Sequence, residues 1–130
     1  MIALDTSALV AIAMSEAEEE AFDRIIVAEG AIVGAPTLVE LHFVLAGRGT
    51  GAARFIDRTL ARNNLVTLPF DLHHYRAAAT AFERFGKGRG HPAQLNFGDC
   101  MAYAVAKTHG LPLLYKGTDF ALTDIRPALN

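Results

Sequence analysis

The stretch MIALDTSALVAIA, residues 1–13, decides the fold class. It opens with four apolar residues, and the polar triplet Asp5-Thr6-Ser7 follows at once. Small and branched apolar residues then recur at the spacing of one helix face, at Ala8, Leu9, Ile12 and Ala13. A short buried strand is therefore expected to run directly into a helix, with Asp5 at the junction.

The same alternation continues to the end of the chain. Further strands are expected at residues 31–33, 65–68 and 113–115, and helices at residues 15–29, 37–46, 52–63, 71–85 and 96–109, with a short element around residues 124–126. Ser15 is expected to cap the second helix. Glycines interrupt the helices at residues 47–51 and 86–92. Strands that alternate with helices predict an α/β fold, a three-layer α/β/α sandwich with a mainly parallel central sheet.

Composition limits the possible classes of protein. The 130 residues fit one domain, residues 1–130, and 52% of them are hydrophobic against 20% charged, which predicts a well-buried core. The formal net charge is −2, so the chain lacks the strong basic excess of most nucleic-acid binders. Any RNA contact would depend on a local basic patch.

The chain has a single cysteine, Cys100, which excludes a disulfide framework within the chain and a zinc site built from cysteines. Asp5 interrupts the apolar start before a signal peptide could form, and no apolar run reaches membrane-spanning length. A cytoplasmic protein without membrane contact is expected.

Four acidic residues, Asp5, Glu40, Asp99 and Asp119, stand at or near the expected starts of helices. Taken singly, each is more simply explained as a helix cap. Thr37 with Glu40, and Asn96 with Asp99, have the spacing of a capping box. Taken together they favour a site, because strand-to-helix junctions of a parallel sheet share its carboxyl edge, where ligands bind in such folds.

The apolar neighbours of Glu40 and Asp99 predict that these carboxylates are partly buried. Buried like charges repel one another unless a cation compensates, and among the four acids only Asp119 has a basic neighbour, Lys116. Oxygen ligands suit Mg²⁺ or Mn²⁺ better than zinc. A bound divalent metal ion is therefore expected as the counter-charge of these carboxylates.

Four segments carry a family resemblance: residues 4–7 (LDTS), 37–40 (TLVE), 95–104 (LNFGDCMAYA) and 114–125 (LYKGTDFALTDI). In order and spacing they resemble a PIN domain of the VapC type, the toxin of bacterial toxin–antitoxin pairs. The resemblance covers essentially the whole chain. Its acidic positions correspond to Asp5, Glu40, Asp99 and Asp119, and Ser7 and Thr118 would be supporting hydroxyls. Many relatives carry Asn or Asp where this chain has Thr118.

The resemblance implies a Mg²⁺- or Mn²⁺-dependent endoribonuclease that hydrolyses RNA through metal-activated water and leaves 5′-phosphate and 3′-hydroxyl ends. In the mechanism expected from it, the metal ligands are Asp5, Asp99 and Asp119, with Asp119 binding directly or through water, and Glu40 orients or deprotonates the attacking water. The resemblance also implies a homodimer and a VapB-like antitoxin partner, joined in a heterotetramer or larger complex.

Basic residues that could contact RNA fall in two groups. One is a helix face with arginines at every fourth residue, and the other lies in glycine-rich loops; together they comprise Arg48, Arg54, Arg58, Arg62, Lys87 and Arg89. An ordinary solvated surface explains them equally well. The acidic run Glu16, Glu18, Glu19 and Glu20 is expected to be a solvated helix face.

Two other functions share some of these sequence features. A haloacid-dehalogenase-like phosphatase also places an Asp after its first strand, but it needs a second Asp where this chain has Ser7. A catalytically silent PIN-like module that only binds RNA or an antitoxin is the alternative to the nuclease, and metal-dependent RNA cleavage separates the two.

Overall fold

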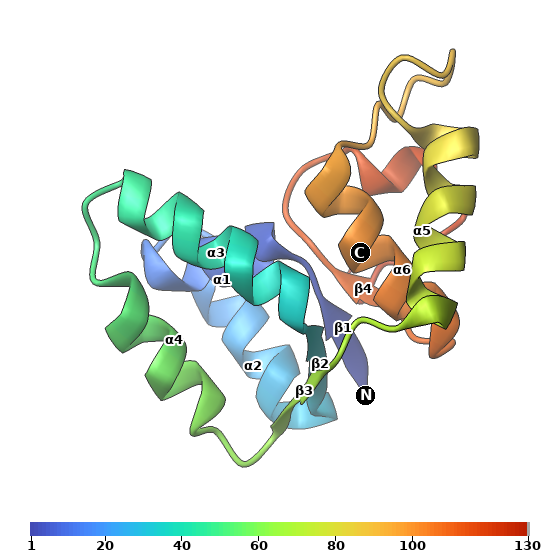
Figure 1. Cartoon of the computed structure of the whole chain (residues 1–130). Coiled ribbons are helices and arrows are strands. Elements are labelled where there is room, and N and C mark those ends of the chain that lie inside the picture. The colour runs from blue at the N-terminus through green and yellow to red at the C-terminus, as the bar shows by residue number, and fades with distance from the viewer. Residues whose placement is uncertain (130) are drawn as a thin grey trace.

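The computed structural model describes residues 1–129, in which a four-stranded sheet lies between two groups of helices (Figure 1). The strands are β1 (Ile2–Leu4), β2 (Ala31–Gly34), β3 (Leu65–Leu68) and β4 (Leu113–Leu114). They pair in the order β3-β2-β1-β4, and every pairing is parallel. The predicted α/β/α sandwich with a parallel sheet is confirmed.

The helices form the two outer layers. They are α1 (Thr6–Ala13), α2 (Glu19–Glu29), α3 (Ala35–Gly47), α4 (Ala52–Leu60), α5 (Leu72–Phe85), α6 (Phe97–Thr108) and the 3₁₀ turn η1 (Phe120–Leu122). Figure 1 shows α1 to α4 on one side of the sheet and α5 with α6 on the other. No helix within residues 1–129 is long and apolar enough to cross a membrane.

Each layer encloses its own hydrophobic core. Ile2 and Leu4 of β1 pack in the core beneath α1 to α4, whereas Ala3 faces the core beneath α5 and α6. This alternation follows from the two-residue period of a strand. α6 approaches the sheet closely, since a Cβ atom at Gly34 of β2 would lie 2.8 Å from the Val105 side chain. The small residue at this position of β2 therefore allows α6 to reach the sheet.

Three predicted elements start two or more residues away from their predicted positions, and α4 ends at Leu60 rather than at residue 63. α2 begins at Glu19, because Ser15 has a left-handed backbone (φ 52°) and cannot start a helix. α3 begins at Ala35, because Pro36 occupies its first turn, where proline needs no N–H partner. The C-terminal element is the turn η1, before the predicted residues 124–126.

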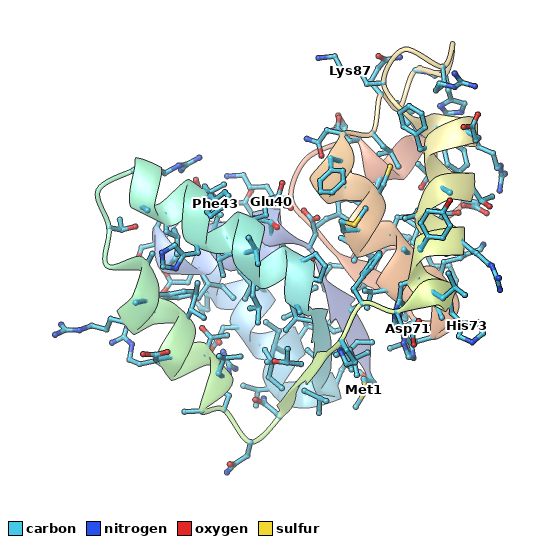
Figure 2. The ribbon with its side chains drawn as sticks, in the orientation of Figure 1. Met1, Glu40, Phe43, Asp71, His73 and Lys87 are labelled. Carbon is cyan, nitrogen blue, oxygen red and sulfur yellow. The ribbon has the colours of Figure 1, made fainter. Side chains whose placement is uncertain are left out.

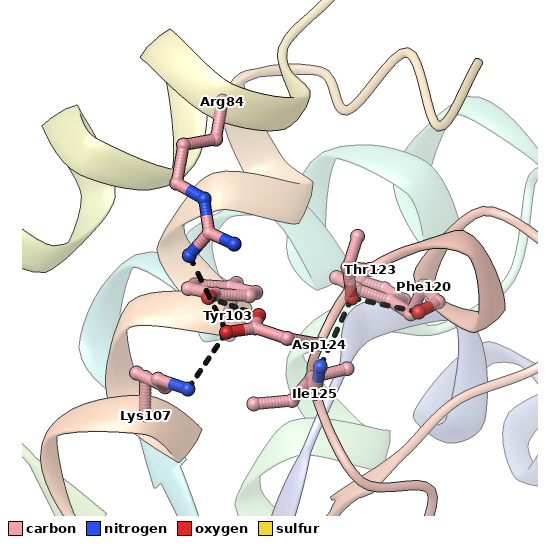
Figure 3. Close-up of polar contacts among 7 residues, drawn as sticks. All are labelled: Arg84, Tyr103, Lys107, Phe120, Thr123, Asp124 and Ile125. Atoms are coloured by element: carbon pink, nitrogen blue, oxygen red, sulfur yellow. Dashed lines mark hydrogen bonds and ion pairs between the residues drawn. The ribbon is translucent and has the colours of Figure 1, made fainter. Parts of the chain in front are cut away.

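Asp124 fixes the segment that follows β4 onto α6 (Figure 3). Its carboxylate accepts hydrogen bonds from Tyr103 Oη (2.5 Å), Lys107 Nζ (2.9 Å) and Arg84 Nη1 (3.4 Å). Partial burial acts to raise its pKa, but the hydrogen bonds from Tyr103 and Lys107, with the charges of Lys107 and Arg84, lower that pKa to about 2. This contact anchors the loop that carries Thr118 and Asp119.

Candidate active site

A cavity of about 430 Å³ lies at the carboxyl edge of the sheet, where β1 ends. Its walls come from α1, α3, α6 and the segments after α1 and β4, and are formed by Asp5, Thr6, Ser7, Val10, Glu16, Glu40, Val44, Arg48, Asp99 and Lys116. Three of the four predicted acids, Asp5, Glu40 and Asp99, thus share one cavity. Figure 2 shows Glu40 on the side of α3 that faces α6.

Asp5 is both the cap of α1 and the most buried acid of the site, with only 4% of its surface exposed. Its Oδ2 accepts hydrogen bonds from the backbone N–H (2.9 Å) and the hydroxyl (2.6 Å) of Ser7. Its Oδ1 is buried, and no described residue donates a hydrogen bond to it. Burial, with the nearby charges of Asp99 and Glu40, raises the pKa of Asp5 to about 6 despite the Ser7 bonds.

Glu40 lies in the second turn of α3, and its Oε1 accepts a hydrogen bond from the Thr6 hydroxyl. The predicted capping box with Thr37 was wrong, because α3 begins at Ala35 with Gly34 as its cap. The Glu40 carboxylate lies against the backbone of Gly98 in α6, where any Cβ atom would overlap it. Gly98 therefore makes room for the acid from the neighbouring layer.

Asp99 forms the predicted capping box at the start of α6. Its N–H donates to Asn96 Oδ1 (2.8 Å), and its Oδ2 accepts from the Asn96 N–H (3.0 Å). α6 follows α5 rather than a strand. A short turn joins the end of α6 to the start of β4, so the start of α6, with Asp99, lies at the carboxyl edge of the sheet. Burial foremost, then the charges of Asp119 and Glu40, raise the pKa of Asp99 to about 6 despite its backbone hydrogen bond.

Asp119 and Thr118 lie in the loop after β4 and are exposed, outside the cavity wall. The charge of Asp119 nevertheless contributes to the raised pKa of Asp99, so the two carboxylates interact. The structure thus gathers Asp5, Ser7, Glu40 and Asp99 and leaves Asp119 and Thr118 at the margin.

Of the six predicted RNA-contacting residues, only Arg48 lines the cavity. Arg54 and Arg58 line a separate depression beside α4. Arg62 Nη1 pairs with Asp23 Oδ1 at 2.7 Å, and Arg89 Nη2 pairs with Glu83 Oε2 at 2.6 Å. Figure 2 shows Lys87 beyond the end of α5, far from Glu40.

Sequence reasoning missed two charged residues of the cavity, Lys116 and Glu16. Glu16 was expected on a solvated face, but its side chain is 28% exposed and pairs with Lys116 Nζ (3.1 Å) and Arg48 Nη1 (3.9 Å). The available signal for Lys116 was its position two residues after β4, which places it at the same carboxyl edge of the sheet as Asp5. Glu16 had no comparable signal, since its partners are distant in sequence.

The donor set fits a hard divalent cation. It offers carboxylate oxygens whose mutual repulsion a cation would relieve, and the unpartnered Oδ1 of Asp5 is the clearest position for one. Within residues 1–129, no group of three or more His, Cys, Asp or Glu side chains is close enough to form a ligand set by itself. Water would therefore complete the coordination, as is usual for Mg²⁺.

Comparison with known proteins gives the family. The profile of the PIN domain matches residues 2–125. Ribonuclease VapC42 of Mycobacterium tuberculosis is 40% identical over 130 residues, covering 96% of this chain and 97% of that protein. Ribonuclease VapC of Mycolicibacterium smegmatis is also 40% identical, covering 94% of this chain and 95% of its own. The chain is a PIN-domain protein of the VapC family.

Solved structures of VapC proteins share the fold of this family member. Mycobacterium tuberculosis VapC20, described as a sarcin-ricin loop cleaving toxin, superposes with a TM-score of 0.77 at 17% identity, covering 96% of both chains. A chain of VapBC2 from Rickettsia felis, solved bound to a promoter DNA fragment, gives a TM-score of 0.71 at 15% identity, covering 98% of this chain and 96% of its own.

The burial of Asp5 makes stability depend on pH. Its pKa rises from 3.8 to about 6 on folding, so between these values the folded state binds more protons and stability falls as pH rises. Asp5→Asn keeps an acceptor for Ser7 but removes the charge. We expect it to raise the free energy of unfolding at pH 7 by about 1 to 3 kcal/mol without divalent ions.

Urea denaturation measures this effect at several pH values. The difference between Asp5→Asn and the unsubstituted chain should shrink as pH falls through 6 toward 3.8. Asp57→Asn, on the exposed side of α4, should change stability little. Equal stability of the Asp5→Asn variant and the unsubstituted chain at pH 7 would contradict the burial argument.

Gly98→Ala tests the contact between α6 and Glu40. The added Cβ would overlap the Glu40 carboxylate, the movable end of a flexible side chain, so the carboxylate should leave the Thr6 hydroxyl. A crystal structure should show this displacement, while the free energy of unfolding changes by less than about 1 kcal/mol. Gly47→Ala, with open space around it, is the control. An undisplaced Glu40 in the Gly98→Ala crystal would refute the proposed contact.

Proposed function

We propose that this chain is a divalent-metal-dependent endoribonuclease acting as the toxin of a VapBC-type toxin–antitoxin pair. The observation that carries the proposal is the convergence of Asp5, Glu40 and Asp99 on one cavity, with a buried Asp5 oxygen that has no protein donor. Relatives that match nearly the whole chain are named ribonucleases, which supports RNA as the substrate.

In this proposal Asp5 and Asp99 hold Mg²⁺ or Mn²⁺, and Asp119 binds it directly or through water. Two carboxylates completed by water suit the octahedral preference of Mg²⁺. When bound, the ion supplies Lewis-acid chemistry, stabilising negative charge on the phosphate oxygens and making water more acidic.

The chain's own residues position the reacting groups. Ser7 holds Oδ2 of Asp5, while the buried Oδ1 has no donor among the described residues and is the oxygen proposed to bind the ion. Thr6 and Gly98 both contact the Glu40 carboxylate, and in this proposal that carboxylate accepts a proton from the attacking water. Hydrolysis breaks a phosphodiester bond of RNA and leaves a 5′-phosphate and a 3′-hydroxyl.

Asp99→Asn tests the metal-dependent mechanism. We expect it to reduce cleavage of a test RNA in Mg²⁺ or Mn²⁺ by at least about 100-fold, because a ligand that stabilises transition-state charge is lost. EDTA should abolish cleavage by the unsubstituted chain. Asp57→Asn should cleave normally.

RNA-cleavage assays test both metal dependence and the alternative of a silent binding module. Undiminished cleavage in EDTA would overturn metal dependence. Bound but uncut RNA with either ion would favour the module that binds without catalysis.

We also propose an antitoxin partner and a homodimer. Structural neighbours include a toxin–antitoxin complex from Klebsiella pneumoniae and VapBC2, which supports a VapB-like partner. The support for a homodimer is an apolar groove of about 660 Å³ between α3 and α6, in which Phe43 is 72% and Phe97 81% exposed. Contiguous apolar surface of this kind is typical of a protein interface.

Phe43→Asp tests the homodimer. Light scattering should give the mass of two chains for the unsubstituted protein and of one for the variant, because a carboxylate buried in an apolar interface lacks a partner. Val27→Asp, at an exposed apolar residue of α2, is the matched control and should stay dimeric. A monomeric unsubstituted chain, or a dimeric Phe43→Asp variant, would contradict the use of this groove.

A further inference from the structure

The cavity has a basic wall as well as an acidic one. Arg48, just beyond α3, and Lys116, just beyond β4, are its cationic residues among those described. The Glu16 carboxylate contacts both, at 3.9 Å from Arg48 Nη1 and 3.1 Å from Lys116 Nζ. Glu16 thus pairs with both cations of the cavity.

The basic wall is linked directly to the acidic wall. The Lys116 N–H donates to Ser7 Oγ (2.9 Å), and the same hydroxyl donates to Asp5 Oδ2 (2.6 Å). One side chain therefore separates the backbone of Lys116 from the most buried acid. An RNA strand whose scissile phosphate reached Asp5 and Asp99 would bring an adjacent phosphate toward these cations.

The backbone brings Glu16 into this position. Ser15 adopts the left-handed conformation, which is uncommon for a residue other than glycine, and the Glu16 N–H donates to Ala11 O (2.8 Å) at the end of α1. The chain thus turns sharply after α1 and directs Glu16 back toward the cavity.

We propose that Arg48 and Lys116 form a phosphate subsite for RNA and that Glu16 occupies this subsite in the RNA-free chain, as an internal competitor of the phosphate. The inference deepens the proposed function and rests on it. A carboxylate and a phosphate oxygen accept the same charge-assisted hydrogen bonds from these cations, so one replaces the other. Glu18 also pairs with Lys116 Nζ, at 3.3 Å, but it does not line the cavity.

Glu16→Gln tests the competition. Affinity is measured by fluorescence anisotropy with a short fluorescent single-stranded RNA of mixed sequence, in the Asp99→Asn background so that the RNA stays intact. Glu16→Gln should bind the RNA about threefold to fivefold more tightly, the range expected for losing a partly exposed ion pair that competes with the ligand. Lys116→Ala should weaken binding.

A double-mutant cycle separates competition from general charge. Removing any negative charge near the cavity favours RNA, but only competition for these cations disappears when the cations are removed. The gain from Glu16→Gln should therefore vanish when Arg48 and Lys116 are both alanine. Glu20→Gln, which breaks an exposed ion pair with Arg24 on α2, should leave the affinity unchanged.

Three outcomes would overturn the inference: unchanged affinity in Glu16→Gln, a gain that persists without Arg48 and Lys116, or no RNA binding by any variant. The binding cycle needs no cleavage. If the unsubstituted chain binds RNA but does not cut it in Mg²⁺ or Mn²⁺, the proposed nuclease function fails while the phosphate subsite stands.

Discussion

The buried carboxylate of Asp5 is the constraint on which the site depends. Folding removes it from water at the end of β1, a cost that two hydrogen bonds from Ser7 only partly offset. Glu40 and Asp99 add repulsion rather than relief, because both approach the same cavity with negative charge. This cluster of carboxylates is unfavourable by itself and would become favourable once a cation is bound. Charge repulsion of this kind is typical of sites that bind metal.

The site belongs to neither core alone. Asp5 and Glu40 are carried by the layer of α1 to α4, whereas Asp99 is carried by α6 on the other face of the sheet. Their approach depends on small residues where the layers meet, with Gly34 beneath Val105 and Gly98 beside Glu40. The Asp124 contacts with α5 and α6 then fix the loop that brings Asp119 to the margin of the cavity.

The parts of the structure that arise from local pattern could be predicted from the sequence. The strand-to-helix junction at Asp5 and the capping box of Asn96 and Asp99 depend on neighbouring residues, and the structure has both. The helix predicted at residues 37–46 begins two residues earlier, because proline at position 36 suits the first turn of a helix. The pairing of Glu16 with Arg48 and Lys116 joins segments far apart in sequence, so no periodicity or spacing could indicate it.

The hydrogen bonds of the three acids also limit how they can coordinate. Asp5 Oδ2 is engaged by Ser7, Asp99 Oδ2 by Asn96 and Glu40 Oε1 by Thr6. Asp5 and Asp99, the proposed ligands, thus each have one oxygen held by a hydrogen bond within the chain, which favours monodentate coordination through the other oxygen. A large ion such as Ca²⁺ commonly takes both oxygens of a carboxylate, whereas a small octahedral ion needs only one. In the proposed metal site, the contacts that build the helix starts would therefore also select for a small ion.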